Sequence, residues 1–312
     1  MKKFLLFIFI ITIGILIWKK DDVSQFVIQK IIFKDQYEIA EPNEYYKSED
    51  FLLLQNTNEL TIKSKDDFNN FLYTILNSGY DSFSFFCDFG YKNCINDFKD
   101  YIQNDNYVEA INNYVHPFNS FDGLSVSINN FNKITIEIEN LYSEEQKIVI
   151  NEMLDIFIKK HITNNMTTKE KIKVFHDWLI NNTKYDKNFD INSNKDSYPY
   201  HPYTAYGALV EGYAVCSGYS DAMAIYLNKL GIKNYKISNY TEKATDERHV
   251  WNYVLVENKW YHLDLTWDDP ITSNNSDILI YDFFLIANKE LQKKETKIHK
   301  FNQIYYPEAK NS

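Results

Sequence analysis

The sequence predicts a globular α+β protein in which a small mixed unit precedes a larger domain, helical at first and rich in strands later. Hydrophobic residues form 45% of the 312 residues, enough to supply cores for one large or two ordinary domains. Apolar residues recur at helical spacing in some segments and alternate with polar residues in others. The order of these segments places the small unit at residues 48–140 and the larger domain at residues 141–312.

The first twenty residues differ from the rest of the chain. Two lysines precede fifteen uncharged, almost wholly apolar residues, Phe4 to Trp18, and Lys19 and Lys20 close the run. This pattern is typical of a signal peptide or a short membrane anchor. No small residues of the A-x-A type follow, which favours an uncleaved anchor. We therefore expect residues 1–20 to be a signal peptide or anchor, and the remainder to be secreted or held outside the cytoplasm at the membrane.

Net charge and cysteine content limit which binding partners and which covalent or metal links we expect. The formal net charge is -10, with acidic and basic residues interspersed, which argues against a nucleic-acid partner. Cys87 and Cys94 bracket the short segment "CDFGYKNC" and could form a disulfide in an oxidising compartment. Two buried free thiols are the alternative. Zinc binding is not expected, because no second pair of Cys or His stands nearby.

Residues 21–47 are mixed and polar and contain a proline, which predicts a linker. In the small α+β unit that follows, Ser64 is expected to cap a helix with one apolar stripe, and Gly79 to end it. This unit carries no concentrated chemistry. The rest of it is predicted as a strand, a helix and a hairpin at residues 82–89, 94–104 and 124–140.

The larger domain opens with two helices. Ser143 with Gln146, and Thr167 with Glu170, have the spacing of capping boxes ahead of amphipathic segments. Residues 186–206, rich in Asn, Asp, Pro and Tyr, predict a loop. A third helix and three strands follow, the strands in "NYKISN", "HVWNYVLV" and "KWYHLDLTW".

Cys216 lies in the first turn of that third helix. Apolar residues recur at steps of three and four beyond Tyr219, and Gly231 predicts the helix end. Counting back three residues from Tyr219 places Cys216 on the inward stripe, where free backbone N–H groups and the helix dipole favour a thiolate. Gly212 and Gly218 would allow close backbone approach. A small buried cysteine packed at a helix start is the alternative.

A thiolate nucleophile needs a base that carries protons and a partner that orients the base. His249 opens one predicted strand, and Asp264 lies in the next. The turn between them is short, around Asn258 and Lys259, so the two strands should form an antiparallel hairpin.

The register of this hairpin decides whether the two side chains meet. Pairing Glu257 with Trp260 would place Asp264 opposite Tyr253, on the same face as His249. In that register about 13 Å along the strand would separate His249 from Asp264. A bulge, a longer loop or strong twist would have to close the gap.

The other histidines are weaker candidates for the base. His176, in mid-helix, is expected to be a surface or satisfied core residue, and His201 has no nearby carboxylate in a fixed element. His262 shares a face with Asp264, which favours a packing or hydrogen-bonding role. His161 is suited to a favourable interaction with a helix C-terminus.

No pattern of metal ligands is present. The sequence lacks H-x-x-x-H, C-x-x-C and calcium-loop motifs. Asp268 and Asp269, ahead of Pro270, are therefore interpreted as turn residues. No metal and no other cofactor is expected.

Three blocks, in order, resemble a known family. They are "KIKVFHDWLINNTKYD", "TAYGALVEGYAVCSGYSDAMAIYLNKLGI" and "HVWNYVLVENKWYHLDLTWDDP". Together they resemble the transglutaminase-like superfamily, a branch of the papain-like cysteine enzymes common in bacterial extracytoplasmic proteins. The resemblance covers about residues 143–290 and does not extend through residues 48–140.

The resemblance implies a papain-like core in which a buried helix carrying the cysteine packs on an antiparallel sheet carrying the histidine and aspartate. By position it implies that Cys216 is the nucleophile, that His249 is the general base and acid, and that Asp264 orients the histidine. It also implies an oxyanion held by the backbone N–H of Cys216 and a second donor.

Three aromatic residues are candidates for contacts with the oxyanion or the substrate. Tyr206 lies ten residues before the cysteine and is a candidate second donor. Tyr219 and Trp251 are further candidates.

We expect acyl transfer from protein or peptide amide bonds through a thioester. Hydrolysis is favoured, because nothing in the sequence marks a second substrate pocket. A protein-crosslinking transglutaminase and a non-catalytic peptide-binding or structural envelope module are the alternatives. The N-terminal segment points to a substrate in the cell envelope.

Overall fold

The computed structural model describes most of the chain, namely residues 41–58, 60–88, 90–130, 132–189, 198–243, 246–270, 278–294 and 296–310. The predicted signal or anchor, and the predicted linker up to residue 40, lie outside these ranges. Within them, no helix is both long enough and apolar enough to cross a membrane.

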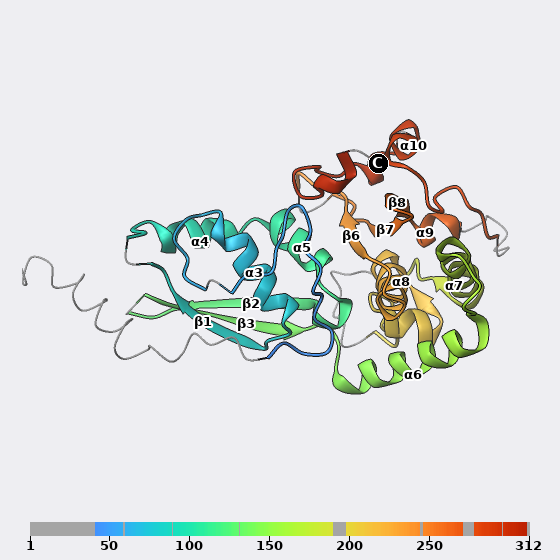
Figure 1. The fold of residues 1–312 in the computed structure, drawn as a ribbon, viewed down its shortest axis with the longest axis horizontal. Helices are drawn as coiled ribbons and strands as arrows, with labels where there is room; N and C mark the ends of the chain where they lie inside the picture. The colour runs from blue at the N-terminus through green and yellow to red at the C-terminus, as the bar shows by residue number, and fades with distance from the viewer. Residues whose placement is uncertain are drawn as a thin grey trace, which may run out of the picture.

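The N-terminal part contains a three-stranded antiparallel sheet in the order β1-β3-β2, with helices on one side (Figure 1). Residues alternate along β3, so its isoleucines point into the core and its glutamates are more exposed. The predicted hairpin is thus β2–β3. The strands are β1 (Ser82–Phe86), β2 (Phe121–Ile128) and β3 (Lys133–Asn140). The helices are α3 (Asp67–Asn77), α4 (Cys94–Ile102) and α5 (Asp105–Tyr114), of which α5 was not predicted.

The start of α3 differs from the prediction. Ser64 does not cap this helix. Instead, the carboxylate of Asp67 accepts hydrogen bonds at 2.8 Å from the backbone N–H groups of Lys63 and Ser64, closing the turn that leads into the helix. Gly79 does end the helix, in the left-handed conformation (φ +72°) that favours glycine.

A disulfide joins Cys87 to Cys94. It links the residue after β1 to the first residue of α4, which is otherwise held by aromatic packing of Phe98 against Phe68 and Phe85. The bond therefore ties one strand of the sheet to a helix that covers it.

The C-terminal part is helical first and β-rich later, as predicted. Both capping boxes are present, at Ser143 and Thr167. Its helices are α6 (Glu144–His161), α7 (Thr168–Asn182), the π-helical turn η4 (Gly207–Glu211), α8 (Cys216–Lys229), α9 (Leu265–Asp268) and α10 (Asn288–Lys293). Its strands are β4 (Lys184–Tyr185) and β5 (Tyr213–Ala214), which pair in parallel, and β6 (Asn234–Ser238), β7 (Val250–Val256) and β8 (Lys259–Leu263), which form an antiparallel sheet.

The β6-β7-β8 sheet separates two hydrophobic cores. Val254 and Leu263 face α8 and its neighbouring helices. Tyr235, Trp251 and Tyr253 join the aromatic core of the N-terminal part, where α5 packs along β6. The chain is therefore continuously packed across the boundary predicted at residue 140.

The end of the predicted linker is also packed. Lys47 is buried, and its Nζ donates to the carbonyl oxygens of Tyr114 (3.0 Å) and Asn234 (2.8 Å). Burial lowers the pKa of Lys47 to about 7. Lys47 thus bridges α5 and β6, and this end of the predicted linker is part of the packed structure.

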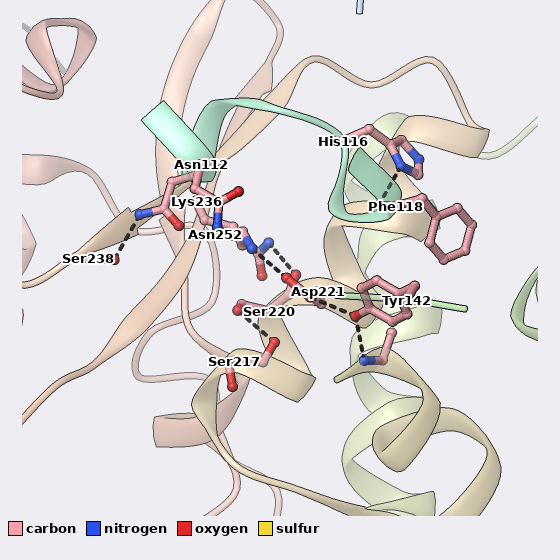
Figure 2. A network of polar contacts seen from close by, with 12 residues as sticks. Asn112, His116, Phe118, Tyr142, Ser217, Ser220, Asp221, Lys236, Ser238 and Asn252 are labelled. Carbon is pink, nitrogen blue, oxygen red and sulfur yellow. Dashed lines mark hydrogen bonds and ion pairs between the residues drawn. The ribbon is translucent and has the colours of Figure 1, made fainter. Parts of the chain in front are cut away.

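Helix α8 is fixed by a buried polar network (Figure 2). Asp221, which is 1% exposed, accepts hydrogen bonds from Nζ of Lys236 in β6 and from the hydroxyl of Tyr142 ahead of α6 (2.6 Å). The same hydroxyl accepts the N–H of Ala205 (2.8 Å). Asn252 in β7 donates to a backbone carbonyl of α8 (2.8 Å). The helix is therefore tied to the sheet and to the segment that precedes η4.

We predict that Asp221→Ala lowers the free energy of unfolding by about 3–5 kcal/mol, because it leaves the Lys236 ammonium buried without a counter-charge. Adding Lys236→Met should recover part of this loss. Urea unfolding would measure both. The matched control is Glu109→Ala, which removes the ion pair with the exposed side chain of Arg248 and should cost less than about 1 kcal/mol. A double variant no more stable than Asp221→Ala would contradict the explanation.

Candidate active site

Cys216 is the first residue of α8 and is half-buried. A Cβ on Gly218 would lie 2.4 Å from the carbonyl oxygen of Pro202 and 2.9 Å from that of Thr204. Only glycine admits this contact, so the predicted close approach occurs at Gly218. Gly212 is needed for a different reason, its left-handed backbone (φ +77°). The chain before the helix is thus held tightly against its first turn, where the thiol lies.

His249 lies one residue before β7 and is 6% exposed. Asn239 holds its backbone from both sides: Oδ1 of Asn239 accepts the His249 N–H (2.8 Å), and the Asn239 N–H donates to the His249 carbonyl (3.0 Å). The imidazole stacks on the ring of Trp251 at 5.6 Å. Its Nε2 lies 2.6 Å from Oδ2 of Asp264.

Asp264 follows β8 directly and begins the short helix α9. Its Oδ1 accepts the backbone N–H groups of Thr266 (3.0 Å) and Trp267 (3.3 Å), and its side chain is 2% exposed. These two bonds orient the carboxylate so that Oδ2 faces His249. The aspartate is thus a helix cap and a histidine partner at once.

The register between β7 and β8 explains how His249 and Asp264 meet. The two-residue turn is Glu257–Asn258, both with positive φ, so the pairing continues to place Asp264 opposite Trp251 and not opposite Tyr253. The predicted register was wrong by two residues, which leaves the side-chain face unchanged. The remaining offset is about 7 Å along the strand, which two side chains can span.

The electrostatics favour a charged imidazole. Burial would lower the pKa of His249, but the carboxylate of Asp264, together with the hydrogen bond and charge of Cys216, raises it to about 10. Burial would raise the pKa of Asp264, but cationic His249 and the hydrogen bonds from His249 and His299 hold it well below its usual range. Because Nε2 of His249 is used by Asp264, Nδ1 is the nitrogen left for the thiol. The arrangement suits a thiolate–imidazolium pair.

His299 is part of this cluster and was not predicted. It lies in the turn η5 (Lys297–His299), and its Nε2 is 2.8 Å from the same Oδ2 of Asp264. Its Nδ1 is 2.7 Å from Oγ1 of Thr296. The sequence around it, "KIHKF", has no periodicity and falls beyond the family resemblance, so no local signal marks it.

Three ligand-type groups, those of His249, Asp264 and His299, lie within 4.8 Å of one another. Two ligands bound tetrahedrally at the usual zinc distances would be about 3.4 Å apart. The contacts of 2.6 and 2.8 Å are shorter than this and have the length of hydrogen bonds to a carboxylate. The cluster therefore fits a hydrogen-bonded His–Asp–His set and not a metal centre.

The three aromatic candidates have other partners. The ring of Tyr206 packs against His201. The Tyr219 hydroxyl donates to Asp269 (2.5 Å). The indole N–H of Trp251 donates to Nδ1 of His262 (2.9 Å), so Trp251 supports His249 by stacking. Trp251, whose N–H is engaged, is therefore not available as an oxyanion donor.

Tyr185 is a nearer candidate that the sequence did not mark. It pairs with Ala214, two residues before the cysteine, through the β4–β5 ladder. Burial, followed by the charges of Cys216, Glu247 and Asp264, raises the pKa of Tyr185 to about 12. Its hydroxyl thus keeps its proton at neutral pH, within electrostatic reach of the thiolate.

The remaining histidines have ordinary roles. His176 is a satisfied core residue between Asp177 (3.0 Å) and Asp268 (3.2 Å). His201 does have a carboxylate in a fixed element, Glu211 at 2.9 Å, contrary to expectation. Burial lowers the pKa of His262 to about 3, so its neutral ring accepts the bond from the indole, which confirms the predicted hydrogen-bonding role.

Asp268 and Asp269 are more than turn residues. Asp268 is buried, and its carboxylate contacts His176 and accepts the N–H of Phe283 (2.8 Å). Asp269 accepts the hydroxyl of Tyr219. Through these bonds α9 is joined to α7 and α8, which corrects the sequence interpretation.

An α+β fold with a cysteine at the start of a buried helix, and a histidine and aspartate on the adjoining sheet, is the architecture of the papain-like class. Residues 157–265 match the family model of the transglutaminase-like superfamily. No curated protein matches the sequence.

Several solved structures are distantly similar. They include a TGase (18% identity, TM-score 0.33, covering 51% of this chain and 47% of that one). Another is a candidate cysteine protease from Cytophaga hutchinsonii (12% identity, TM-score 0.29, covering 51% of this chain and 65% of that one). A third is the periplasmic domain of TgpA from Pseudomonas aeruginosa (13% identity, TM-score 0.26, covering 43% of this chain and 53% of that one). The match thus spans 47–65% of the length of these structures.

We predict that His249→Asn slows alkylation of Cys216 by iodoacetamide at pH 7 about tenfold, because an ordinary thiol is only a few per cent ionised there. With its pKa near 10, His249 stays protonated below that pH. The wild-type rate should therefore change little between about pH 6 and 9. The rate of the variant should rise through this range like that of an ordinary thiol. His176→Asn is the matched control, and identical wild-type and His249→Asn profiles would contradict the ion pair.

Proposed function

We propose that the protein is a cysteine-dependent acyl-transfer enzyme that cleaves amide bonds in proteins or peptides, with water as the acceptor. The observation that carries this proposal is the position of His249. This buried histidine lies between Cys216 and Asp264, and both neighbours raise its pKa. A buried cation between two acidic groups is costly to maintain for binding alone, and it is what thiolate chemistry requires.

The reaction has two steps. The Cys216 thiolate bonds to the carbonyl carbon, and the C–N bond breaks as His249 gives its proton to the departing amine, leaving a thioester. His249 then takes a proton from water while the water oxygen bonds to the same carbon. The C–S bond breaks with its electron pair on sulfur, which restores the thiolate and the imidazolium.

The oxyanion of each tetrahedral intermediate needs two donors. As the first residue of α8, Cys216 has a backbone N–H without a partner inside the helix. We assign the second donor to the hydroxyl of Tyr185 in place of Tyr206, whose ring packs against His201.

A groove of about 650 Å³ supports a peptide substrate. The exposed rings of Trp267 and Tyr240 line it together with Ile298, and Trp267 lies 6.5 Å from the ring of His249. Because His249 delivers the proton to the leaving amine, this groove would hold the leaving side of the substrate.

Hydrolysis is favoured over transfer by the position of a second large pocket that the described residues form. That pocket lies around Lys229–Lys233 at the C-terminal end of α8. Cys216 is at the opposite end of the helix, about 20 Å away by helical rise. A second substrate in that pocket could not reach the thioester.

Crosslinking is a second candidate, favoured by one observation. Three acidic residues, Glu242, Asp246 and Glu247, line the groove beside His249 against two lysines, Lys297 and Lys300, so its lining carries a small excess of negative charge that would attract a lysine amine. A non-catalytic binding module is disfavoured, because peptide binding does not require a paired cysteine, histidine and aspartate.

The cell envelope is the proposed location of the substrate, with the protein anchored in the membrane or secreted. The support is the apolar N-terminal run in the sequence and the Cys87–Cys94 disulfide, a bond typical of oxidising compartments. No nucleic-acid partner is proposed, given the net charge of -10.

The decisive experiment compares the full-length chain with Cys216→Ala on a mixed protein substrate in the presence of a tagged primary amine. Cleavage that depends on Cys216 is expected. Tag incorporation that depends on Cys216, without cleavage, would replace hydrolysis with transfer. Equal cleavage and equal tag incorporation by the two proteins would refute the proposal that the protein is a Cys216-dependent enzyme.

We also predict that Tyr185→Phe lowers kcat by about 10²-fold, as loss of one oxyanion donor does elsewhere, while KM changes little. Steady-state kinetics on a peptide cleaved in the first experiment would measure this. Tyr206→Phe is the matched control and should keep its kcat. A loss of kcat in Tyr206→Phe but not in Tyr185→Phe would identify Tyr206 as the second oxyanion donor.

A further inference from the structure

We propose that His299 is a positioning residue that stabilises the buried charge of Asp264 while His249 is neutral, and so supports the resolution of the thioester. This inference rests on the proposed function. It concerns one hydrogen bond, from Nε2 of His299 to Oδ2 of Asp264 at 2.8 Å.

The contact with Asp264 fixes which nitrogen of His299 is the donor to the carboxylate. An ionised carboxylate only accepts, so Nε2 of His299 carries a proton and donates it to Asp264. Nδ1, on the other side of the ring, contacts the hydroxyl of Thr296 at 2.7 Å. Thr296 thereby holds the ring with its Nε2–H aimed at the carboxylate.

Aromatic rings hold His299 in place and keep water away. Phe283 stacks on it at 4.8 Å, and Trp267 and Trp251 meet it edge-on at 4.9 and 5.1 Å. His299 is 5% exposed and Asp264 is 2% exposed. If the histidine donor were removed, little water could replace it.

The need for this donor changes during the reaction. In the free enzyme, the charge of Asp264 is balanced by the imidazolium of His249. Once His249 has given its proton to the leaving amine, that balance is gone and the carboxylate stays buried. It then depends on its remaining hydrogen-bond donors: His249 and His299 at Oδ2, and the backbone groups of Thr266 and Trp267 at Oδ1.

In the thioester state His249 is neutral, so the Asp264 carboxylate depends most on its hydrogen-bond donors there. Neutral His249 must keep its Nε2–H on Asp264 so that Nδ1 can take a proton from water. A carboxylate short of one donor is a poorer anchor for that ring and is more easily protonated. Loss of His299 should therefore slow thioester hydrolysis more than formation of the ion pair or of the thioester.

The test uses p-nitrophenyl acetate with the full-length chain, because an activated ester separates the two steps. Its leaving group needs no proton, so the burst of p-nitrophenolate reports thioester formation and the steady rate reports its resolution. His299→Phe fits the aromatic surroundings but lacks the donor. It should keep the burst amplitude and lose about tenfold or more in steady rate, the scale of one hydrogen bond to a charged group.

His299→Gln should keep the steady rate within about threefold, because its amide nitrogen can donate to the same oxygen. His161→Gln, at the end of α6, is the matched control and should behave as wild type. If water does not resolve the wild-type thioester, putrescine replaces it as the acceptor, and the same loss is expected.

Two results would overturn the inference alone: a steady rate for His299→Phe within twofold of wild type, or equal losses in His299→Gln and His299→Phe with normal bursts. If His299→Phe fails to fold, Thr296→Val, which removes the hydroxyl that holds the ring of His299, must show the same selective loss. A wild-type burst no larger than that of Cys216→Ala would instead refute the proposed function, and the inference with it.

Discussion

The buried ion pair between Asp221 and Lys236 is the contact on which the geometry of the site depends. The candidate nucleophile is on a helix, whereas the histidine and its partner are on a sheet. Their alignment therefore requires α8 to keep a fixed position on β6 and β7. A purely apolar interface would tolerate small sliding, but a buried carboxylate loses its counter-charge if the helix moves. Tyr142 and Ala205 extend the same restraint to the segment that packs on the first turn of α8.

Local features of the fold could be predicted from the sequence. The two capping boxes, the helix that begins at Cys216 and its end at Gly231 depend on residues a few positions apart. The shared face of His249 and Asp264 was also predictable, because an error of two residues in register preserves it. The register itself was not, since the turn at Glu257–Asn258 needs positive φ at a glutamate, which residue preferences argue against.

Features that depend on distant partners could not be predicted. Lys47 reads as part of a polar linker, yet it is buried because carbonyl oxygens of Tyr114 and Asn234 happen to converge on it. His299 lies 35 residues after Asp264 and approaches it only because the chain folds back over the sheet. Neither residue has a pattern of neighbours that reveals a role. The family resemblance could not supply them, because both lie outside the matched stretch.

The disulfide has a practical consequence for counting active molecules. The chain has three cysteines, and two are paired with each other, so one thiol remains. Any thiol-specific label added without reductant therefore has a single destination, the first residue of α8. One equivalent of label per chain would then be an active-site titration. The mass of the labelled protein would report how many molecules in a preparation carry an intact nucleophile, before any substrate is known.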